Sequence, residues 1–430
     1  MKPMRAFLAI SAAVFAAFLS LAQSPPITGL ESLPPASQQL ARIRLHMTDT
    51  LEHQPNYTCL ETVERSYRLT GSRKSQLQDT LRLEVALVDG KEMFAWPGAK
   101  KFEETDLRKM IPNGTFGNGN FALHARSVFL GHVASFEYRG AEIADGATGP
   151  LERYDFHVPR MVSGYTIRVG EHSGVAGYHG SFWADKKSLE VRRLDVIAEE
   201  IPADLGVIAA SDRVDYAHLQ IGNGEFLLPV ASELMMTDST GQESRNHVRF
   251  TSCRQYTGES TLRFDDPDSS AAPAATGSSR NAAPGASADL PEADLPTGTA
   301  FALTLDQDVD LDSAAVGDPM RAHLNSDLRR KGEVLARKGA AAYGRITRLE
   351  RHDSYMVLAI TLVTLETGLE TGAATLRVTA RLDDVAGLQL LAPPRNTRVQ
   401  TGPPQPGEGL IILKAGHVRL SRGILMYWRT

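Results

Sequence analysis

The chain has 430 residues, a formal net charge of -5 at pH 7 and a charged fraction of 23%. This length exceeds what one hydrophobic core ordinarily serves, so we expect two or three domains. The mild negative charge gives no electrostatic reason to expect nucleic acid as a partner.

Residues 1–22 have the pattern of a secretory signal peptide. Lys2 and Arg5 precede an apolar run from Ala6 to Ala22, and small residues stand at Ser20 and Ala22. The pattern predicts cleavage after Ala22 and export of the mature chain. No later apolar run is long enough to cross a bilayer as a helix, so we expect no transmembrane span in the mature chain.

The first domain begins with one amphipathic helix and continues in strands. Leu40, Ile43, Met47 and Leu51 recur at helical spacing and predict a helix over 37–52. Alternation of apolar and polar residues then predicts a long antiparallel sheet with one wet face. The alternating runs lie near 57–69, 81–87, 136–138, 154–158, 165–169 and 226–236. The Asp-Gly pair in VDGKE, 88–92, predicts a hairpin turn.

A helical interruption over 103–130 divides these strands. The glycine-rich NGTFGNGN, with Gly114, Gly117 and Gly119, splits it and predicts a flexible hinge. The glycine order differs from a dinucleotide fingerprint, so phosphate binding is not indicated. We expect a helical flap across the sheet, with Asn120 as a helix cap.

A linker separates the two domains. The segment from Pro267 to Asp289 has no aromatic or large aliphatic residue, which predicts a flexible linker over 265–294. The first domain then spans 23–264 and the second 295–430. The second domain is a series of short runs between Gly, Asp and Pro turns, which predicts a small β-barrel. We expect the two domains to fold separately.

The chain has only two cysteines, Cys59 and Cys253. Metal and redox sites built on cysteine use close pairs, whereas these two stand far apart in the sequence. Disulfides form and persist in exported proteins, so we expect a structural bridge, with two buried free thiols as the alternative. Cys253 alternates out of phase with Val248 and Phe250, so the bridge needs a bulge or an outward-facing geometry.

Two groups of residues invite a metal without matching a ligand pattern. DQDVDLDS, 306–313, has aspartates at alternate positions, but Leu311 and Gly317 occupy the glycine and glutamate positions of an EF-hand. We expect these carboxylates on one solvated face, with weak cation binding as the alternative. Five histidines of the first domain lack zinc-site spacing and are expected on the surface. They are His124, His132, His157, His172 and His179. We predict no metal, no cofactor and no enzymatic activity.

The first domain resembles the LolA/LolB family of bacterial lipoprotein carriers. The resemblance rests on the leading helix before YTCLETVERSYR, on LRLEVALVDGKEMFAWPG, and on HGSFWADKKSLEVRRLDV followed by FLLPVASEL. It covers most of residues 36–262 and implies an antiparallel half-barrel with helices plugging its open side. The implied function is binding of a lipid, acyl chain or lipoprotein in an apolar groove, in the periplasm or at the outer membrane.

Ordinary core packing is the alternative interpretation of the same apolar face, and it would leave a scaffold that binds protein partners only. If the groove is open, its expected lining is Tyr67, Leu83, Leu87, Phe94, Trp96, Phe136 and Tyr138.

The second domain resembles the small barrel of TrbI-like conjugation and secretion-channel proteins. The resemblance rests on LPTGTAFALTLD, on Gly317-Asp318, on RKGEVLARKGAAAYGRITRLER and on LKAGHVRLSR. Arg337 stands where proline is usual in that family, and the transmembrane helices of the channel subunits are absent. The resemblance therefore implies a module that docks to another envelope protein.

Overall fold

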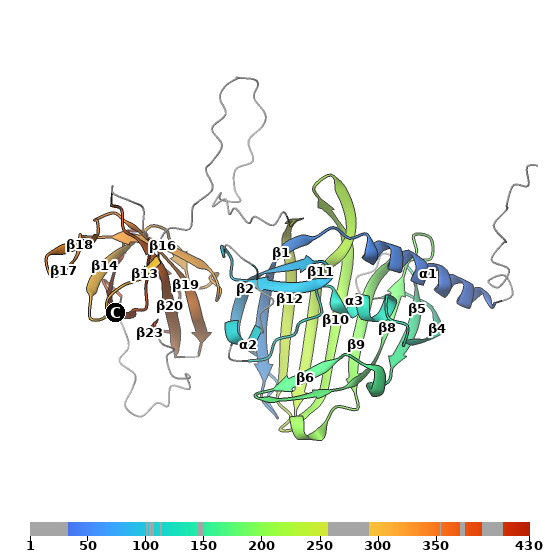
Figure 1. Cartoon of the computed structure of the whole chain (residues 1–430). Helices are drawn as coiled ribbons and strands as arrows, with labels where there is room; N and C mark the ends of the chain where they lie inside the picture. The colour runs from blue at the N-terminus through green and yellow to red at the C-terminus, as the bar shows by residue number, and fades with distance from the viewer. Residues whose placement is uncertain are drawn as a thin grey trace, which may run out of the picture.

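The structure, a computed structural model, describes residues 33–99, 102, 107–111, 114–144, 149–256, 292–352, 354–369, 375–388 and 407–430. The described residues are mainly β and form two sheet-based units (Figure 1). The expected signal peptide, and the expected linker except its last three residues, lie outside the described residues. Separate folding of the two domains stays a prediction.

The first unit is a curved antiparallel sheet of ten strands, in the order β3-β2-β1-β12-β11-β10-β9-β8-β5-β4. Its strands are β1 (Tyr57–Arg68), β2 (Gln76–Val88), β3 (Lys91–Ala95), β4 (Ser135–Glu142), β5 (Leu151–Val158), β8 (Gly177–Ala184), β9 (Val191–Glu199), β10 (Val207–Ile221), β11 (Gly224–Asp238) and β12 (Glu243–Gln255). The predicted hairpin joins β2 to β3, with φ of 50° at Asp89 and 79° at Gly90. The expected half-barrel is confirmed.

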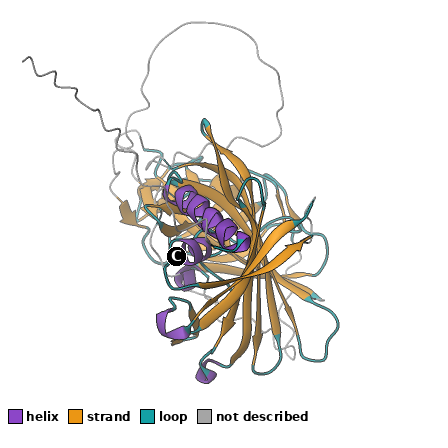
Figure 2. Cartoon of the chain, turned by 90° about the vertical axis from the view of Figure 1, so that its right-hand side faces the viewer, coloured by secondary structure: helices purple, strands orange, loops and turns teal. Residues whose placement is uncertain are grey.

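Helices pack against this sheet (Figure 2). They are α1 (Pro35–Glu52), α2 (Leu107–Met110) and α3 (Leu123–Phe129), with 3-10 turns at Arg160–Val162 (η1) and Ala203–Leu205 (η2). A small hairpin of β6 (Thr166–Val169) and β7 (His172–Val175) lies outside the main sheet. The predicted helix over 37–52 is confirmed as α1, whose Ile43, Met47 and Leu51 are buried at helical spacing. None of the helices in the described ranges combines the length and apolarity that crossing a bilayer requires.

Helix α1 and α3 fill one end of the curved sheet. Ile43, Met47 and Phe129 pack with Tyr154 and Phe182, which project from β5 and β8. The rings of Tyr154 and Phe182 stack with centroids 5.2 Å apart, and Phe129 meets Phe182 edge-on at 5.1 Å. Every side chain in this group is buried and apolar or aromatic, so this end is ordinary hydrophobic core.

The second unit is a sheet of nine strands that curls into a small barrel. Its main path is β13-β21-β20-β19-β16-β14-β25-β22, and β23 pairs with β20 beside β21. The nine strands are β13 (Glu292–Asp294), β14 (Ala300–Leu305), β16 (Pro319–Leu324), β19 (Ala341–Arg351), β20 (Tyr355–Glu366), β21 (Thr375–Arg377), β22 (Arg381–Val385), β23 (Glu408–Lys414) and β25 (Leu425–Arg429). Two small two-stranded sheets accompany them, one of β15 (Val309–Asp310) with β24 (Arg419–Leu420) and one of β17 (Leu328–Arg330) with β18 (Glu333–Ala336). Gly409 of β23 lies so close to Leu382 of β22 that a Cβ would approach its backbone N to 2.8 Å. This approach brings the two ends of the curled sheet together, as expected for a barrel.

Candidate functional site

Cys59 and Cys253 form a disulfide, with an S–S distance of 1.97 Å. In the pairing of β1 with β12, Thr58 faces Arg254 and Leu60 faces Thr251, so two residues of β12 lie opposite Cys59. One of them, Ser252, has a φ of 50°. This conformation accommodates the extra residue of β12 as a β-bulge. The bridge is confirmed, and of the two geometries that its phase allowed, the structure has the bulge. The bridge joins the first long strand to the last.

The expected flap divides into two parts. Helix α3 joins the α1 core, whereas residues 107–122, of which 107–111 and 114–122 are described, cover the opposite end of the sheet; we call these described residues the flap loop. Leu107, Ile111 and Phe121 of the flap loop are buried against β1, β2 and β12. The ring of Phe121 lies 4.9 Å from Tyr57 and 5.1 Å from Phe250, centroid to centroid.

Glu92, on β3, binds the end of the flap loop. Its carboxylate accepts hydrogen bonds from the backbone N–H groups of Gly119 (2.9 Å), Ala122 (2.8 Å) and Leu123 (3.1 Å). Desolvation by burial raises the pKa of Glu92, and the three N–H groups oppose that rise. The carboxylate therefore caps the start of α3 from a neighbouring strand.

Two further hydrogen bonds hold the flap loop to the sheet. Asn120 Nδ2 donates to Ser232 Oγ at 2.8 Å, and Asn246 Nδ2 donates to the backbone carbonyl of Thr115 at 2.9 Å. The prediction that Asn120 caps a helix is wrong, because Ala122 is the N-cap residue and has no side-chain cap. Asn120 instead turns toward the sheet.

A small cavity lies between the flap loop and strands β1, β2, β11 and β12. Its apolar wall includes Val63, Leu83 and Val248 from the sheet, and Ile111 and Phe116 from the flap loop. Its volume, measured for the centre of a water-sized sphere, is about 10 Å³, which is room for about one water molecule. The covered state shown here therefore has no space for an acyl chain.

Among the described residues of the cavity wall, Glu61 is the one with an ionisable side chain. It projects from β1 between Leu83 and Phe250 of the flanking strands and is 4% exposed. No hydrogen bond or ion pair to its carboxylate occurs within the described ranges. Desolvation by burial, with a smaller contribution from Glu92, raises the pKa of Glu61 to about 8, so the side chain carries a proton at neutral pH.

A buried ion pair lies further along strands β1 and β2. Arg65 donates from Nε to Asp79 Oδ1 at 2.7 Å, and both side chains are almost fully buried. Sequence analysis missed Glu61, Arg65 and Asp79 as inward-facing residues. The signal was present, because Glu61 and Arg65 alternate in phase with the buried Cys59.

The predicted groove residues do not form one surface. Leu83 lines the cavity, and Leu87 and Phe94 are buried in the same core. Phe136 and Tyr138 lie at the α1 end, where Tyr138 is 42% exposed. Tyr67 is half-buried near the end of β1 and belongs to neither group.

Trp96 lies outside the cavity, against the second domain. Arg345 stacks over its ring at 5.6 Å from the centroid. A Cβ placed on Gly317 would approach the ring to 2.8 Å, so the backbone of the second domain is in close contact with the indole. Trp96 is therefore part of the contact between the two domains.

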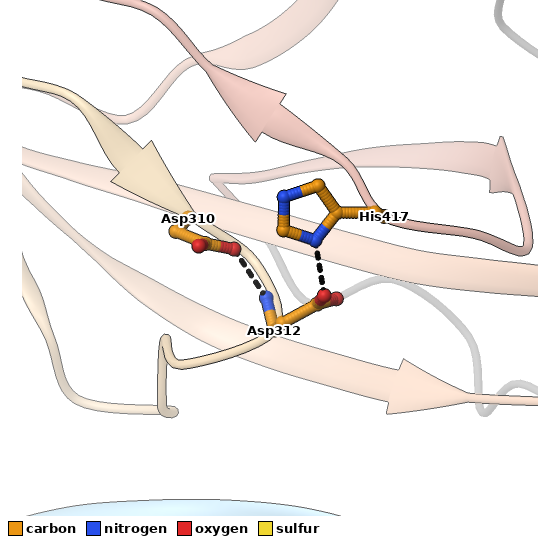
Figure 3. Close-up of side chains that lie close together, drawn as sticks. All are labelled: Asp310, Asp312 and His417. Atoms are coloured by element: carbon orange, nitrogen blue, oxygen red, sulfur yellow. Dashed lines mark hydrogen bonds and ion pairs between the residues drawn. The ribbon is translucent and has the colours of Figure 1, made fainter.

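Asp310, Asp312 and His417 of the second domain place their ligand atoms within 4.8 Å of one another (Figure 3). Their polar atoms already pair within the chain, since Asp310 accepts from the N–H of Asp312 at 3.0 Å and Asp312 binds His417. The hydrogen bond to Asp312 raises the pKa of His417. The prediction that these aspartates lie on a solvated face is confirmed, since Asp308 and Asp312 are exposed whereas Val309 and Leu311 are buried. Only Val309–Asp310 is strand here, and the four carboxylates bond to different partners.

The histidine prediction is wrong for His124, which is buried and binds Asp212 at 3.1 Å. His157 and His179 face each other across β5 and β8 on the exposed side of the sheet, as expected. Both contact the carboxylate of Glu199, at 2.5 Å and 2.9 Å.

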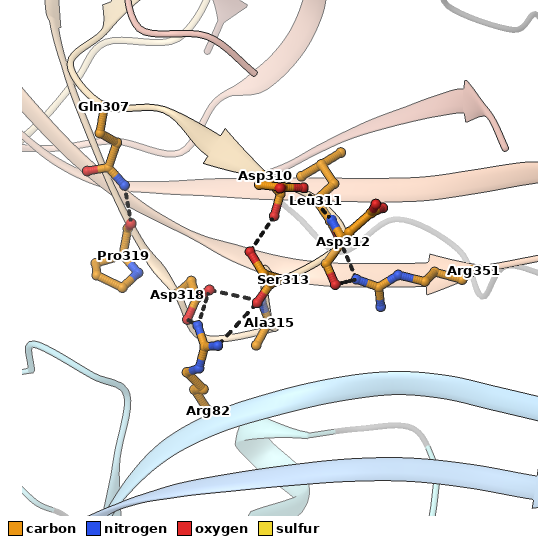
Figure 4. A network of polar contacts seen from close by, with 10 residues as sticks. All are labelled: Arg82, Gln307, Asp310, Leu311, Asp312, Ser313, Ala315, Asp318, Pro319 and Arg351. Carbon is orange, nitrogen blue, oxygen red and sulfur yellow. Dashed lines mark hydrogen bonds and ion pairs between the residues drawn. The ribbon is translucent and has the colours of Figure 1, made fainter. Parts of the chain in front are cut away.

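The second domain docks on the edge of β2 (Figure 4). Strand β3 pairs with β2 only from residue 84 onward, so the edge at 80–82 is free to pair with Val316. Val316 donates to Thr80 O and accepts from Arg82 N, both at 2.8 Å. The Arg82 guanidinium also binds Asp318, at 2.6 Å. Sequence analysis did not predict this contact.

No family model matches the chain, and no curated protein matches it. Among solved structures, the chain is similar to the crystal structure of a DUF1329 family protein from Desulfovibrio piger, with 10% identity and a TM-score of 0.28. That match covers 53% of this chain and 96% of the other. It is too weak to support a functional argument. The comparisons give no support to the resemblance between the second domain and TrbI-like proteins.

Proposed function

We propose that the chain is an exported, non-enzymatic envelope protein that binds a lipid, acyl chain or lipoprotein on the concave face now covered by the flap loop. The main support for this proposal is that the flap loop covers the concave face of the sheet. A separate, glycine-containing segment closes one end of the half-barrel over an apolar cavity, and hydrogen bonds rather than a helix core hold its central part. The opposite end is filled by α1 and needs no such segment.

Ligand binding requires the flap loop to leave the apolar face. The loop places Leu107, Ile111, Phe116 and Phe121 there, and each large apolar side chain contributes about 1.5–3 kcal/mol on burial. An acyl chain gains about 0.8 kcal/mol per buried CH₂, so roughly twelve methylenes match these four side chains. The exchange is therefore close to balanced, and such a chain is long enough to compete with the loop.

The proposed location rests on one feature of the sequence and one of the structure. Residues 1–22 have a secretory pattern, and the one cysteine pair is oxidised in the structure. Disulfides persist in the periplasm and in other oxidising compartments. The second domain is then proposed to dock to an envelope protein partner.

A dansyl-labelled fatty acid tests the proposal on the full chain. We expect saturable binding, tightened by Phe116→Ala because that change enlarges the cavity. Phe136→Ala is the matched control, since Phe136 is also half-buried but lies at the α1 end. Leu83→Glu should abolish binding in protein that retains its circular dichroism spectrum. Equal effects of Phe116→Ala and Phe136→Ala would move the site away from the flap loop.

The alternative is a scaffold that binds protein partners only. The water-sized cavity favours it, because the chain's own side chains fill the concave face in the covered state. A scaffold predicts that no acyl probe binds wild-type protein and that native mass spectrometry of protein from the periplasm shows the bare chain. A co-purified lipid would exclude this alternative.

A further inference from the structure

Glu61 lies beneath the closed flap loop as an acid without a partner. It is 4% exposed, and no donor among the described residues bonds to its carboxyl group. The cavity beside it has room for about one water molecule. An ionised carboxylate has about four acceptor positions, so one water molecule cannot replace its hydration shell. The closed flap loop therefore requires Glu61 in its neutral, protonated form.

The groups around Glu61 offer no compensation for a negative charge. The other ionisable side chains buried in this part of the half-barrel are Tyr57 on β1, Glu92 on β3, Tyr216 on β10, the Arg65–Asp79 pair of β1 and β2, and the His124–Asp212 pair of α3 and β10. Three of these are acids, and both basic side chains are already bound to an aspartate. The cavity walls that β11, β12 and the flap loop supply have no titratable side chain among the described residues. Arg108 of the flap loop bonds instead to the carbonyl of Gly170.

Opening the flap loop returns Glu61 to water. Ile111, Phe116 and Asn120 form the flap-loop wall of its cavity, and they leave together with the loop. Burial raises the pKa of Glu61 to about 8 in the closed state, and hydration returns that pKa toward its ordinary 4.5. Between these two pH values the opening step releases a proton. Each rise of one pH unit therefore shifts the equilibrium toward the open state by up to about tenfold.

We propose that Glu61 is a proton-controlled latch of the flap loop: the neutral side chain keeps the loop closed, and its ionisation opens the loop onto the apolar face. This inference rests on the proposed function, because the open loop is the state that admits an acyl chain. A bound chain covers Glu61 again and restores its proton. The latch therefore sets how often the apolar face opens, and it leaves the affinity for the chain nearly independent of pH.

Hydrogen exchange of the full chain without ligand, from about pH 4.5 to 8, tests the latch. Opening is measured by the protection of the Gly119 and Ala122 amides, after each exchange rate is corrected for the intrinsic rate at that pH. In wild-type protein this protection should fall by up to about tenfold per pH unit. It should stay far below the protection of the Ile43 and Met47 amides in α1, because the opening is local.

Glu61→Gln keeps the volume of the side chain but cannot ionise. Its flap-loop protection should match wild type near pH 4.5 and exceed it by about a hundredfold or more near pH 8. Glu92 also has a raised pKa, and its contribution cancels in this ratio of the two proteins. Glu61→Leu, which cannot ionise either, should behave like Glu61→Gln. Glu84→Gln is the control and should follow wild type, because Glu84 is equally buried but faces the opposite side of β2 and pairs with Arg254.

The possible outcomes separate the latch from the proposed function. If wild-type protection of the flap loop does not change with pH, or if Glu61→Gln and Glu61→Leu keep the wild-type slope, the latch is overturned while the proposed function stands. If the flap-loop amides exchange only by global unfolding, at the rate of the α1 amides at every pH, both are overturned.

Discussion

At the β4–β10 end of the half-barrel, α1 and α3 fill the concave face with Ile43, Met47 and Phe129, and the surrounding side chains are apolar or aromatic. At the β1–β2 end, the flap loop is held by hydrogen bonds to Glu92, Ser232 and Asn246, and it also buries Leu107, Ile111 and Phe121 against the sheet. Polar groups that come apart can bond to water, so each neutral hydrogen bond costs only about 0.5–1.5 kcal/mol to open, and each one to a charged carboxylate about 1.5–3 kcal/mol. The packed apolar side chains of either end have no such substitute in water, so the difference between the two ends lies in the hydrogen bonds that hold the flap loop. The comparison identifies which end of one sheet can open while the other stays closed.

The disulfide is expected to have the largest effect, because it fastens the end that opens. It closes a loop of 194 residues between β1 and β12, and the chain-entropy model gives about 5 kcal/mol for a loop of this size. Cys59→Ala with Cys253→Ala should lower the free energy of unfolding by up to this amount in urea titrations. Two titratable thiols in denatured, unreduced wild-type protein would show that the bridge is absent.

Glu61 makes the stability of the flap-loop end depend on pH. Its pKa is about 8 in the folded chain against an ordinary 4.5, so the folded state holds a proton that the unfolded chain releases. Wild-type stability should therefore fall as pH rises from about 4.5 to 8, by on the order of 4–5 kcal/mol in total. Glu61→Gln should lack this fall and should match wild type below about pH 4.5. If the free energy of unfolding changed with pH in the same way in both proteins, Glu61 would be exposed to water in the folded chain.

Two phenylalanines compare the two ends directly. Phe182→Ala removes a fully buried ring from the α1 core and should cost about 3–5 kcal/mol. Phe116→Ala removes a half-buried ring from the flap loop and should cost about 1 kcal/mol, near the average for single substitutions. Chemical denaturation of both variants measures the difference. Equal losses would mean that the flap loop is core like the rest.

The smallest effect is expected at the contact between the domains. After proteolysis within 267–289, the two fragments should co-elute, because Val316 pairs with β2. Arg82→Ala should weaken that association by about 1 kcal/mol, since its ion pair with Asp318 is partly exposed. Arg139→Ala, which breaks an ion pair with Asp155 on the exposed face, is the control. Wild-type fragments that separate at once would contradict the docking.

Much of the fold could be predicted because alternation, glycine turns and one amphipathic helix are local signals. The Asp89–Gly90 hairpin and the bulge at Cys253 follow from residues within a few positions of each other. The site could be predicted less well. Glu61 has the phase of an inward residue, but whether the flap loop leaves a cavity beside it depends on contacts between residues far apart in the sequence.

Contacts across the chain also decided the remaining differences. Asn120 binds Ser232 instead of capping a helix, because Glu92 already occupies the free N–H groups at the start of α3. Trp96 is apolar and in phase with the sheet face, yet the second domain covers it. Neither outcome is visible in a window of neighbouring residues.

Hydrogen exchange of the flap loop tests the central claim most directly. In the free full chain, the amides of Gly119 and Ala122, which bind Glu92, should exchange through local opening, much faster than the amides of Ile43 and Met47 in α1. Saturation with the dansyl-labelled fatty acid should change the exchange of the flap loop and leave α1 unchanged. If both sets of amides exchange only by global unfolding, at one common rate and with no response to the ligand, the flap loop does not open and the account is contradicted.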